Sequence, residues 1–199
     1  IEDAVEGAPR CTVVLLPMGE VDARLLDHVA FVLQRETGLR TKVYGKTLPL
    51  PEATRMRGLM VGRQWDATPL VEAMSAETSG RRVRGRLQIL VVTSADIYMG
   101  DANYVFAANY DWGSVVSLAR FSENAGGALL RHRAAKLCYG SLIKSLGVPA
   151  AADWRCVTSY SASLGEFDAK GNRPIPETQR LLDGAIERVN REWLQRARQ

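Results

Sequence analysis

Short apolar runs and helically spaced apolar positions alternate through the first part of the chain. Five short runs share an enrichment in β-branched residues, which predicts buried strands. These strands cover residues 11–16, 41–44, 87–93, 104–107 and 114–118. Helical spacing predicts one helix that begins near Val21 and ends before Gly38, and a shorter helix over residues 67–77. Strands and helices that alternate in this way are typical of an α/β sheet.

The pattern changes after residue 125, where helix and loop replace strand. A long helix is predicted over residues 127–146, and its apolar positions are Leu129, Leu130, Ala134, Leu137, Leu142 and Leu146. Residues 148–175 are loop-rich, and a last helix begins near Pro176, where proline suits the first turn. Its apolar stripe consists of Leu181, Leu182, Ile186, Val189, Trp193 and Leu194. We therefore expect a sheet half over residues 1–147 and a loop-rich half over residues 148–199, joined in a single domain.

Composition narrows the class of protein without identifying it. The chain has 199 residues, of which 46% are hydrophobic and 24% charged, as in ordinary soluble domains. Its apolar runs are too short to span a membrane. The net charge of +4 is spread without a long basic block, which favours a solvated surface and leaves RNA contact as a secondary expectation.

Cysteine and histidine usage restricts the metal chemistry. Cys11, Cys138 and Cys156 lie far apart and form no CxxC pair, which argues against a disulfide framework and against a cysteine zinc cage. The chain has two histidines, His28 and His132, so a site built from three histidines is impossible. We interpret both histidines as surface or helix-packing residues. Asp96 and Asp101 could be proposed as oxygen ligands for a metal, but a loop-capping or turn role is favoured for each.

Several segments resemble the archaemetzincins, zinc metallopeptidases of the metzincin clan. The matching segments are Leu16-Pro-Met-Gly-Glu-Val-Asp22, Leu48-Pro-Leu-Pro51, Gly62-Arg-Gln-Trp-Asp66, Val92-Thr-Ser-Ala-Asp96-Ile-Tyr98, Asn103-Tyr-Val-Phe106 and Ser114-Val-Val-Ser-Leu-Ala-Arg120. Their order and spacing extend the resemblance from about residue 12 to about residue 180. The resemblance implies a metzincin-like zincin fold: a twisted mixed sheet with helices, then a loop-rich half and a final helix.

The stretch from Lys136 to Lys170 resembles the family's zinc-binding region, HExxHxxGxxHC followed by C-x-M and a serine-rich run that ends near D-x-K. Frame positions match at Lys136, Leu146, Gly147, Cys156, Asp168 and Lys170. The positions that carry the chemistry differ, because Gly140, Lys144 and Ala150 stand where the resemblance implies the three histidine ligands. Ser141 occupies the position of the catalytic glutamate, and Thr158 that of the methionine beneath the metal.

These replacements remove the side chains that zinc-dependent proteolysis requires. Zinc proteolysis needs three protein ligands and an open position for water, with a glutamate to carry the proton. A protonated lysine has no lone pair to donate and repels a divalent cation. We therefore expect no zinc, no other cofactor and no enzyme activity. At Gly140 we expect close packing by another backbone or side chain in place of a ligand.

The sequence thus predicts a pseudopeptidase that serves as a structural or scaffolding subunit of a larger protein or ribonucleoprotein assembly. Its partners would be other protein subunits, with RNA as a further candidate, and no small-molecule substrate is expected. Val105 and Phe106 are candidate docking residues on an edge strand. We expect an intracellular location, or the mitochondrial matrix if a targeting segment was removed.

Two alternatives stay open. One is a hydrolase with altered chemistry, which would use Ser141 and Lys144 as a serine–lysine pair at helical spacing or a metal borrowed from a partner. The other is a stand-alone module that binds peptides in the old substrate cleft.

Overall fold

A computed structural model describes residues 11–56, 62–78, 87–111, 113–122 and 125–196. Its centre is a five-stranded sheet in the order β2-β1-β5-β8-β7. The strands are β1 (Thr12–Met18), β2 (Arg40–Val43), β5 (Leu87–Thr93), β7 (Ala107–Tyr110) and β8 (Gly113–Ser117). Four strands run parallel, and β7 pairs antiparallel with β8 at one edge. The predicted α/β class with a twisted mixed sheet is confirmed.

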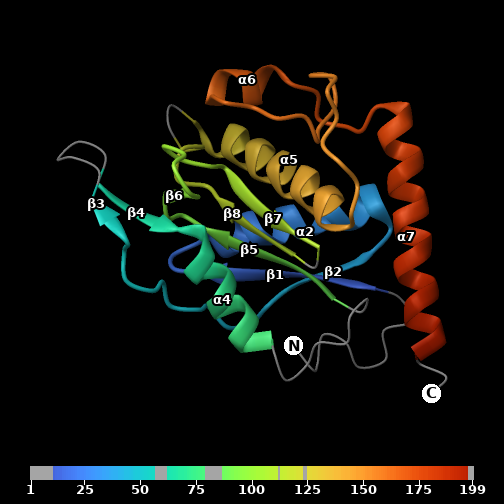
Figure 1. Ribbon diagram of the computed structural model, residues 1–199, viewed down its shortest axis with the longest axis horizontal. Coiled ribbons are helices and arrows are strands. Elements are labelled where there is room, and N and C mark those ends of the chain that lie inside the picture. The colour runs from blue at the N-terminus through green and yellow to red at the C-terminus, as the bar shows by residue number, and fades with distance from the viewer. Residues whose placement is uncertain (1–10, 57–61, 79–86, 112, 123–124, 197–199) are drawn as a thin grey trace.

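Helices cover both faces of this sheet (Figure 1). The helices α2 (Ala23–Thr37) and α5 (Gly127–Ser145) pack on one face, and α4 (Ala67–Thr78) lies on the other. Side chains that alternate along a strand supply both layers. On β5, Leu90 and Val92 join the core beneath α2 and α5, whereas Ile89 and Val91 join the core beneath α4. A strand buried on both faces explains why residues 87–93 are continuously apolar.

A smaller three-stranded sheet extends from the main one in the order β3-β4-β6. It consists of β3 (Arg55–Met56), β4 (Arg63–Asp66) and β6 (Ile97–Tyr98). These strands have two to four residues. Such strands are too short for an alternating pattern to be read, so the sequence did not predict them. The basic cluster from Arg81 to Arg86 lies outside the described residues.

Local signals fix the ends of α2. The Asp22 carboxylate accepts a hydrogen bond from the Arg24 backbone N–H, which caps the first turn. Gly38 ends the helix in the left-handed conformation, with φ of 66°. The predicted inward face is confirmed, because Leu25, Leu26, Val29 and Leu33 are all buried.

The C-terminal part contains the short helix α6 (Leu164–Ala169) and the long helix α7 (Pro176–Arg196). The sequence missed α6, which Ser163 caps through a hydrogen bond from the Glu166 backbone N–H. Leu182, Ala185 and Val189 of α7 pack into the same core as α2 and α5. Leu181 was predicted in the apolar stripe but is exposed, because it lies at the edge of the buried face, about 100° around the helix from Leu182.

One strand boundary and the exposure of one side chain also differ from the prediction. The strand expected over residues 104–107 begins instead at Ala107, because residues 104–106 bridge two neighbours without forming a continuous ladder. Leu129 is exposed, since it lies in the first turn of α5, beyond the edge of the core. No helix in the described ranges combines the length and the hydropathy needed to cross a bilayer.

Candidate functional site

The helix α5 forms the floor of the region that the sequence singled out. Every residue from Arg133 to Ile143 is buried, because one side of the helix packs on β5, β7 and β8 and the C-terminal loops cover the other. Cys138 is a core residue: it is fully buried, and burial raises the pKa of its thiol to about 12.

At Gly140 the loop after α5 lies close against the helix. A methyl group placed on Gly140 would lie 2.8 Å from the carbonyl oxygen of Val157 and 3.6 Å from a Val157 methyl carbon. The expectation of close packing by another backbone at Gly140 is therefore confirmed. A larger side chain at this position cannot reach outward without displacing the loop.

Ser141 and Thr158 are both buried. The Ser141 hydroxyl makes no hydrogen bond to any described residue, and the Ser141 carbonyl accepts one from the Ser114 hydroxyl at 3.3 Å. The Thr158 hydroxyl accepts from the backbone N–H of Ala151 at 3.2 Å and contacts the Cys156 sulfur at the same distance. Thr158 therefore holds two parts of the loop together from within.

Cys156 packs beside Thr158, and its thiol is fully buried. Burial opposes its ionisation, but hydrogen bonds with the hydroxyls of Thr158 and Thr178 outweigh this and lower the pKa of the Cys156 thiol. These contacts describe a residue packed inside the protein.

A pocket of about 110 Å³ lies between α5, the chain leading into β7, and the loop before α6. Its walls include residues 104–107 on one side and residues 159–162 on the other, with Leu137, Lys144, Phe167 and Lys170. Of the five positions where the resemblance places zinc chemistry, only Lys144 lines this pocket. Gly140, Ser141 and Thr158 are covered by protein, and Ala150 is exposed elsewhere on the loop.

Two lysines contribute to the pocket. Burial lowers the pKa of Lys144, whose Nζ has no hydrogen-bond or ion-pair partner among the described residues. Burial and the neighbouring charges of Lys144 and Lys136 lower the pKa of Lys170 to about 8. The Lys170 Nζ donates to the Ser159 carbonyl at 2.9 Å. The pocket is thus a cationic environment with one unpaired ammonium group.

Lys136 holds in place the segment that carries Phe167 and Lys170, two residues that line the pocket. Its buried Nζ donates to the carbonyl oxygens of Phe167 and Lys170 at 2.7 Å and of Asp168 at 3.3 Å. The Asp168 carboxylate in turn binds Arg133 through two hydrogen bonds. These contacts anchor the end of α6 to α5 and so fix the position of Lys170.

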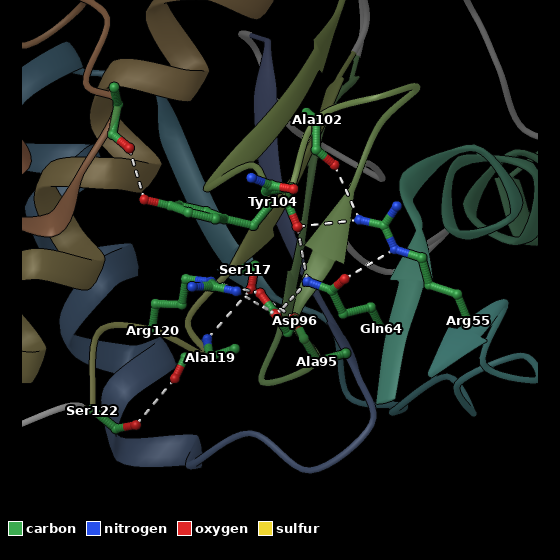
Figure 2. Close-up of polar contacts among 12 residues, drawn as sticks. Arg55, Gln64, Ala95, Asp96, Ala102, Tyr104, Ser117, Ala119, Arg120 and Ser122 are labelled. Carbon is green, nitrogen blue, oxygen red and sulfur yellow. Dashed lines mark hydrogen bonds and ion pairs between the residues drawn. The ribbon is translucent and has the colours of Figure 1, made fainter. Parts of the chain in front are cut away.

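A polar network braces the loop that leads to the other wall of the pocket (Figure 2). Asp96 accepts two hydrogen bonds from the Arg120 guanidinium, at 2.9 and 2.8 Å. Gln64 donates to Asp96 at 2.6 Å and accepts from Arg55 at 2.9 Å, and Arg55 also donates to the Ala102 carbonyl at 3.0 Å. The expected capping or turn role of Asp96 is therefore wrong, because its carboxylate joins three elements in an ion-pair network.

Tyr104 connects this network to the pocket. The Arg120 guanidinium lies over the Tyr104 ring at 3.8 Å, and the Tyr104 hydroxyl donates to the Ala162 carbonyl at 2.7 Å (Figure 2). That bond ties the two walls together across the pocket. Asp96, Arg120 and Gln64 were not predicted as site residues, because only their contacts reveal that they act together.

Val105 and Phe106, the predicted docking residues, lie in the pocket wall. The Val105 backbone N–H donates to Ile97, and the Phe106 carbonyl accepts from Ser117, so these two groups are engaged within the protein. The Phe106 ring packs 5.1 Å from Phe121 and 5.7 Å from Phe167. A charge placed at Phe106 would therefore disrupt this aromatic cluster in addition to any docking surface.

A larger concavity of about 430 Å³ lies between α2 and α5. Its lining brings together both histidines of the chain, His28 and His132, with basic residues from three segments, among them Arg131 and Arg173. Basic side chains outnumber acidic ones in this lining, where Glu36 is the acidic residue and pairs with Arg35.

The residues at the three positions where the resemblance implies histidine ligands do not fit a zinc ion. Gly140 offers no side chain and faces a backbone carbonyl, Lys144 offers an ammonium group, and Ala150 offers a methyl group. Across the described ranges, no group of three His, Cys, Asp or Glu side chains could hold a metal ion. No zinc-dependent step follows from this set of residues.

Comparison with known proteins finds archaemetzincins. No protein-family model matches the chain. It is 27% identical over 186 residues to an archaemetzincin from Natronomonas pharaonis, an alignment that covers 84% of this chain and 97% of that protein.

Solved structures share the fold. The archaemetzincin of Methanopyrus kandleri matches with a TM-score of 0.72 and 23% identity, over 91% of this chain and 98% of its own. A zinc-dependent peptidase from Methanocorpusculum labreanum matches with the same TM-score of 0.72 and 18% identity, over 85% of this chain and 99% of its own. The archaemetzincin of Archaeoglobus fulgidus, solved with malonate, matches with a TM-score of 0.67 and 20% identity, over 85% of this chain and 98% of its own.

Proposed function

We propose, from the premise that the chain is archaemetzincin-like in sequence and fold, that it is a catalytically inactive pseudopeptidase. Its role would be that of a structural or scaffolding subunit in a larger protein assembly. The observation that carries this proposal is the packing of Gly140 against the Val157 carbonyl, with the Lys144 ammonium in the adjoining pocket. By the sequence resemblance, Gly140 and Lys144 both stand at positions where an active peptidase of this kind would need metal ligands.

The serine–lysine alternative receives no support from the positions of its residues. Ser141 is 1% exposed, and its hydroxyl makes no hydrogen bond, to Lys144 or to any other described residue. A nucleophilic serine needs a base within hydrogen-bonding reach and access to the substrate. Ser141 has neither, so the proposal does not use it as a nucleophile.

Exposed aromatic side chains favour a protein partner. Trp154 is 63% exposed and Tyr160 is 83% exposed, and both lie on the loop beside the pocket. Large aromatic residues contribute most of the binding energy at many protein interfaces. The loop from Ala150 to Ser163 is therefore the surface that we assign to a partner subunit. We assign RNA contact, the secondary expectation, to the concavity between α2 and α5, where basic residues gather.

Metal content and peptidase activity test the inactive state. The purified chain, incubated with zinc and then dialysed, should carry far less than one zinc per chain, and should leave casein and fluorogenic peptides intact. Zinc at one equivalent per chain together with peptide cleavage would overturn the proposal.

A matched pair of variants tests the assembly. The tagged chain, expressed in its source cells, should elute within a larger complex whose other subunits are recovered at constant ratios. Trp154→Ala combined with Tyr160→Ala should release the chain from that complex. Phe31→Ala removes an equally exposed aromatic side chain, also 63% exposed but on α2, and should leave the complex intact. Release by both changes, or by neither, would contradict the assignment of this loop.

A further inference from the structure

We propose that the pocket between α5 and the chain leading into β7 binds a carboxylate group carried by a peptide. This inference rests on the proposed function, because a metal in the same place would exclude a lysine ammonium. It goes further by naming the chemical group that the former cleft recognises. The pocket is lined by Lys144, Lys170 and Ser161, and none of its lining residues is an aspartate or a glutamate.

The positive charges in the pocket favour the binding of an anion. The Lys144 side chain is partly buried, and its Nζ has no partner in the described part of the chain. A buried ammonium without a partner is unfavourable, and an oxyanion beside it would restore the lost interactions. Lys170 adds a second positive charge, which a bound anion would also stabilise.

A hydroxyl group supplies a second kind of contact. The Ser161 Oγ is inaccessible to solvent and makes no hydrogen bond to the described residues, although Ser161 lines the pocket. Buried hydroxyl groups nearly always have a partner. A carboxylate held by Lys144 offers a second oxygen that can accept from this hydroxyl. The Tyr104 hydroxyl, in contrast, is already committed to the Ala162 carbonyl.

Size and apolar walls favour a carboxylate on a carbon chain. A volume of about 110 Å³ holds a carboxylate with a few carbons and is too small for a nucleotide. Leu137, Phe106 and Phe167 present apolar surface beside the two lysines. A peptide C-terminus or an acidic side chain has this combination of a charged head and an aliphatic stem, whereas inorganic phosphate has no apolar part.

The test uses short peptides and the intact chain. A tripeptide Ala-Ala-Leu, acetylated at its N-terminus, is compared by NMR titration at pH 7 as the free acid, as the C-terminal amide, and as an amide with glutamate in the last position. We expect the free acid to bind at about millimolar Kd, as suits a ligand of few atoms, and its amide to bind at least tenfold more weakly. Tight binding of the glutamate peptide would assign the carboxylate to a side chain.

Matched lysine variants locate the site. Lys144→Met keeps the length of the side chain and removes its charge, and it should weaken binding of the acid at least tenfold. Lys46→Met removes an exposed lysine that pairs with Glu77, and it should change binding less than twofold. Lys144→Met should also unfold at no lower a temperature, because it removes an unpaired buried charge. Should it fail to fold, Ser161→Ala gives an independent reading and should weaken binding about threefold.

Several results would overturn the inference. They are equal binding of acid and amide peptides, binding of inorganic phosphate in preference to every peptide acid, and equal losses in Lys144→Met and Lys46→Met. Mass spectrometry of the peptide after the titration distinguishes a failure of the proposed inactive function from a failure of the proposed binding site. Cleaved peptide would refute the proposed inactive function, whereas intact but unbound peptide would refute only this binding site.

Discussion

Replacement of Gly140 by alanine tests the packing that closes the position of the first expected ligand. The new methyl group would lie 2.8 Å from the Val157 carbonyl oxygen, closer than a carbon and an oxygen can approach without repulsion. The obstacle is backbone, so the loop itself must move. Overpacking of this kind costs about 1–3 kcal/mol. Alanine also favours the helix over glycine by about 1 kcal/mol, which offsets part of that cost.

Gly184 provides the control for this substitution. It lies in the interior of α7, and a methyl group placed on it meets nothing within 4 Å. Gly184→Ala should therefore stabilise the protein by about 1 kcal/mol through helix propensity alone. Because the propensity gain is common to both variants, the difference between their free energies of unfolding isolates the clash. We expect Gly140→Ala to be the less stable by about 1–3 kcal/mol.

Urea denaturation measures this difference. Both variants should keep the m-value of the parent chain, so that a shift in midpoint reports stability. For a chain of this size, 1 kcal/mol moves the melting temperature by about 2–4 °C, which is readily detected. Equal stabilisation by the two alanines would refute the close approach of Val157, and with it the structural reason given for the glycine.

Two further predictions concern charges around the pocket. Folding lowers the pKa of Lys170 to about 8, so the unfolded chain binds more protons than the folded chain above that pH. The free energy of unfolding should therefore rise from pH 7.5 to 9, by at most about 1.4 kcal/mol per pH unit. Urea denaturation across this range should show that rise in the parent chain and a flatter profile in Lys170→Met; a fall in the parent chain would contradict the burial of this lysine. Asp96→Asn should lower the free energy of unfolding by about 2 kcal/mol, because it breaks a half-buried, two-point ion pair with Arg120. Asp153→Asn breaks the exposed pair with Arg155 and should destabilise the protein much less than Asp96→Asn does, and equal costs would show that the Asp96 network adds nothing.

Elements with strong periodicity were predictable from the sequence. The helices α2 and α5 and the strands β1 and β5 carry enough apolar positions, at regular spacing, to define both their type and their inward faces. The strands β3, β4 and β6 were not predictable, since they exist only because neighbouring segments pair with them. The late start of β7 has the same origin, because Phe106 is held by aromatic packing and a single bond to β8.

For the site too, some properties follow from residue type alone and others depend on the tertiary structure. Residue type alone determines that Gly140, Lys144 and Ala150 offer no metal-binding lone pair, because donor capacity belongs to the side chain wherever it lies. Which of these residues faces a cavity depends on the paths of distant segments. Only the tertiary structure closes Gly140 with the Val157 carbonyl, leaves Lys144 in a pocket, and brings Lys170 beside it. Burial and charge proximity arise from contacts between segments far apart in sequence, and these contacts form a cationic pocket where the residue types alone showed only missing ligands.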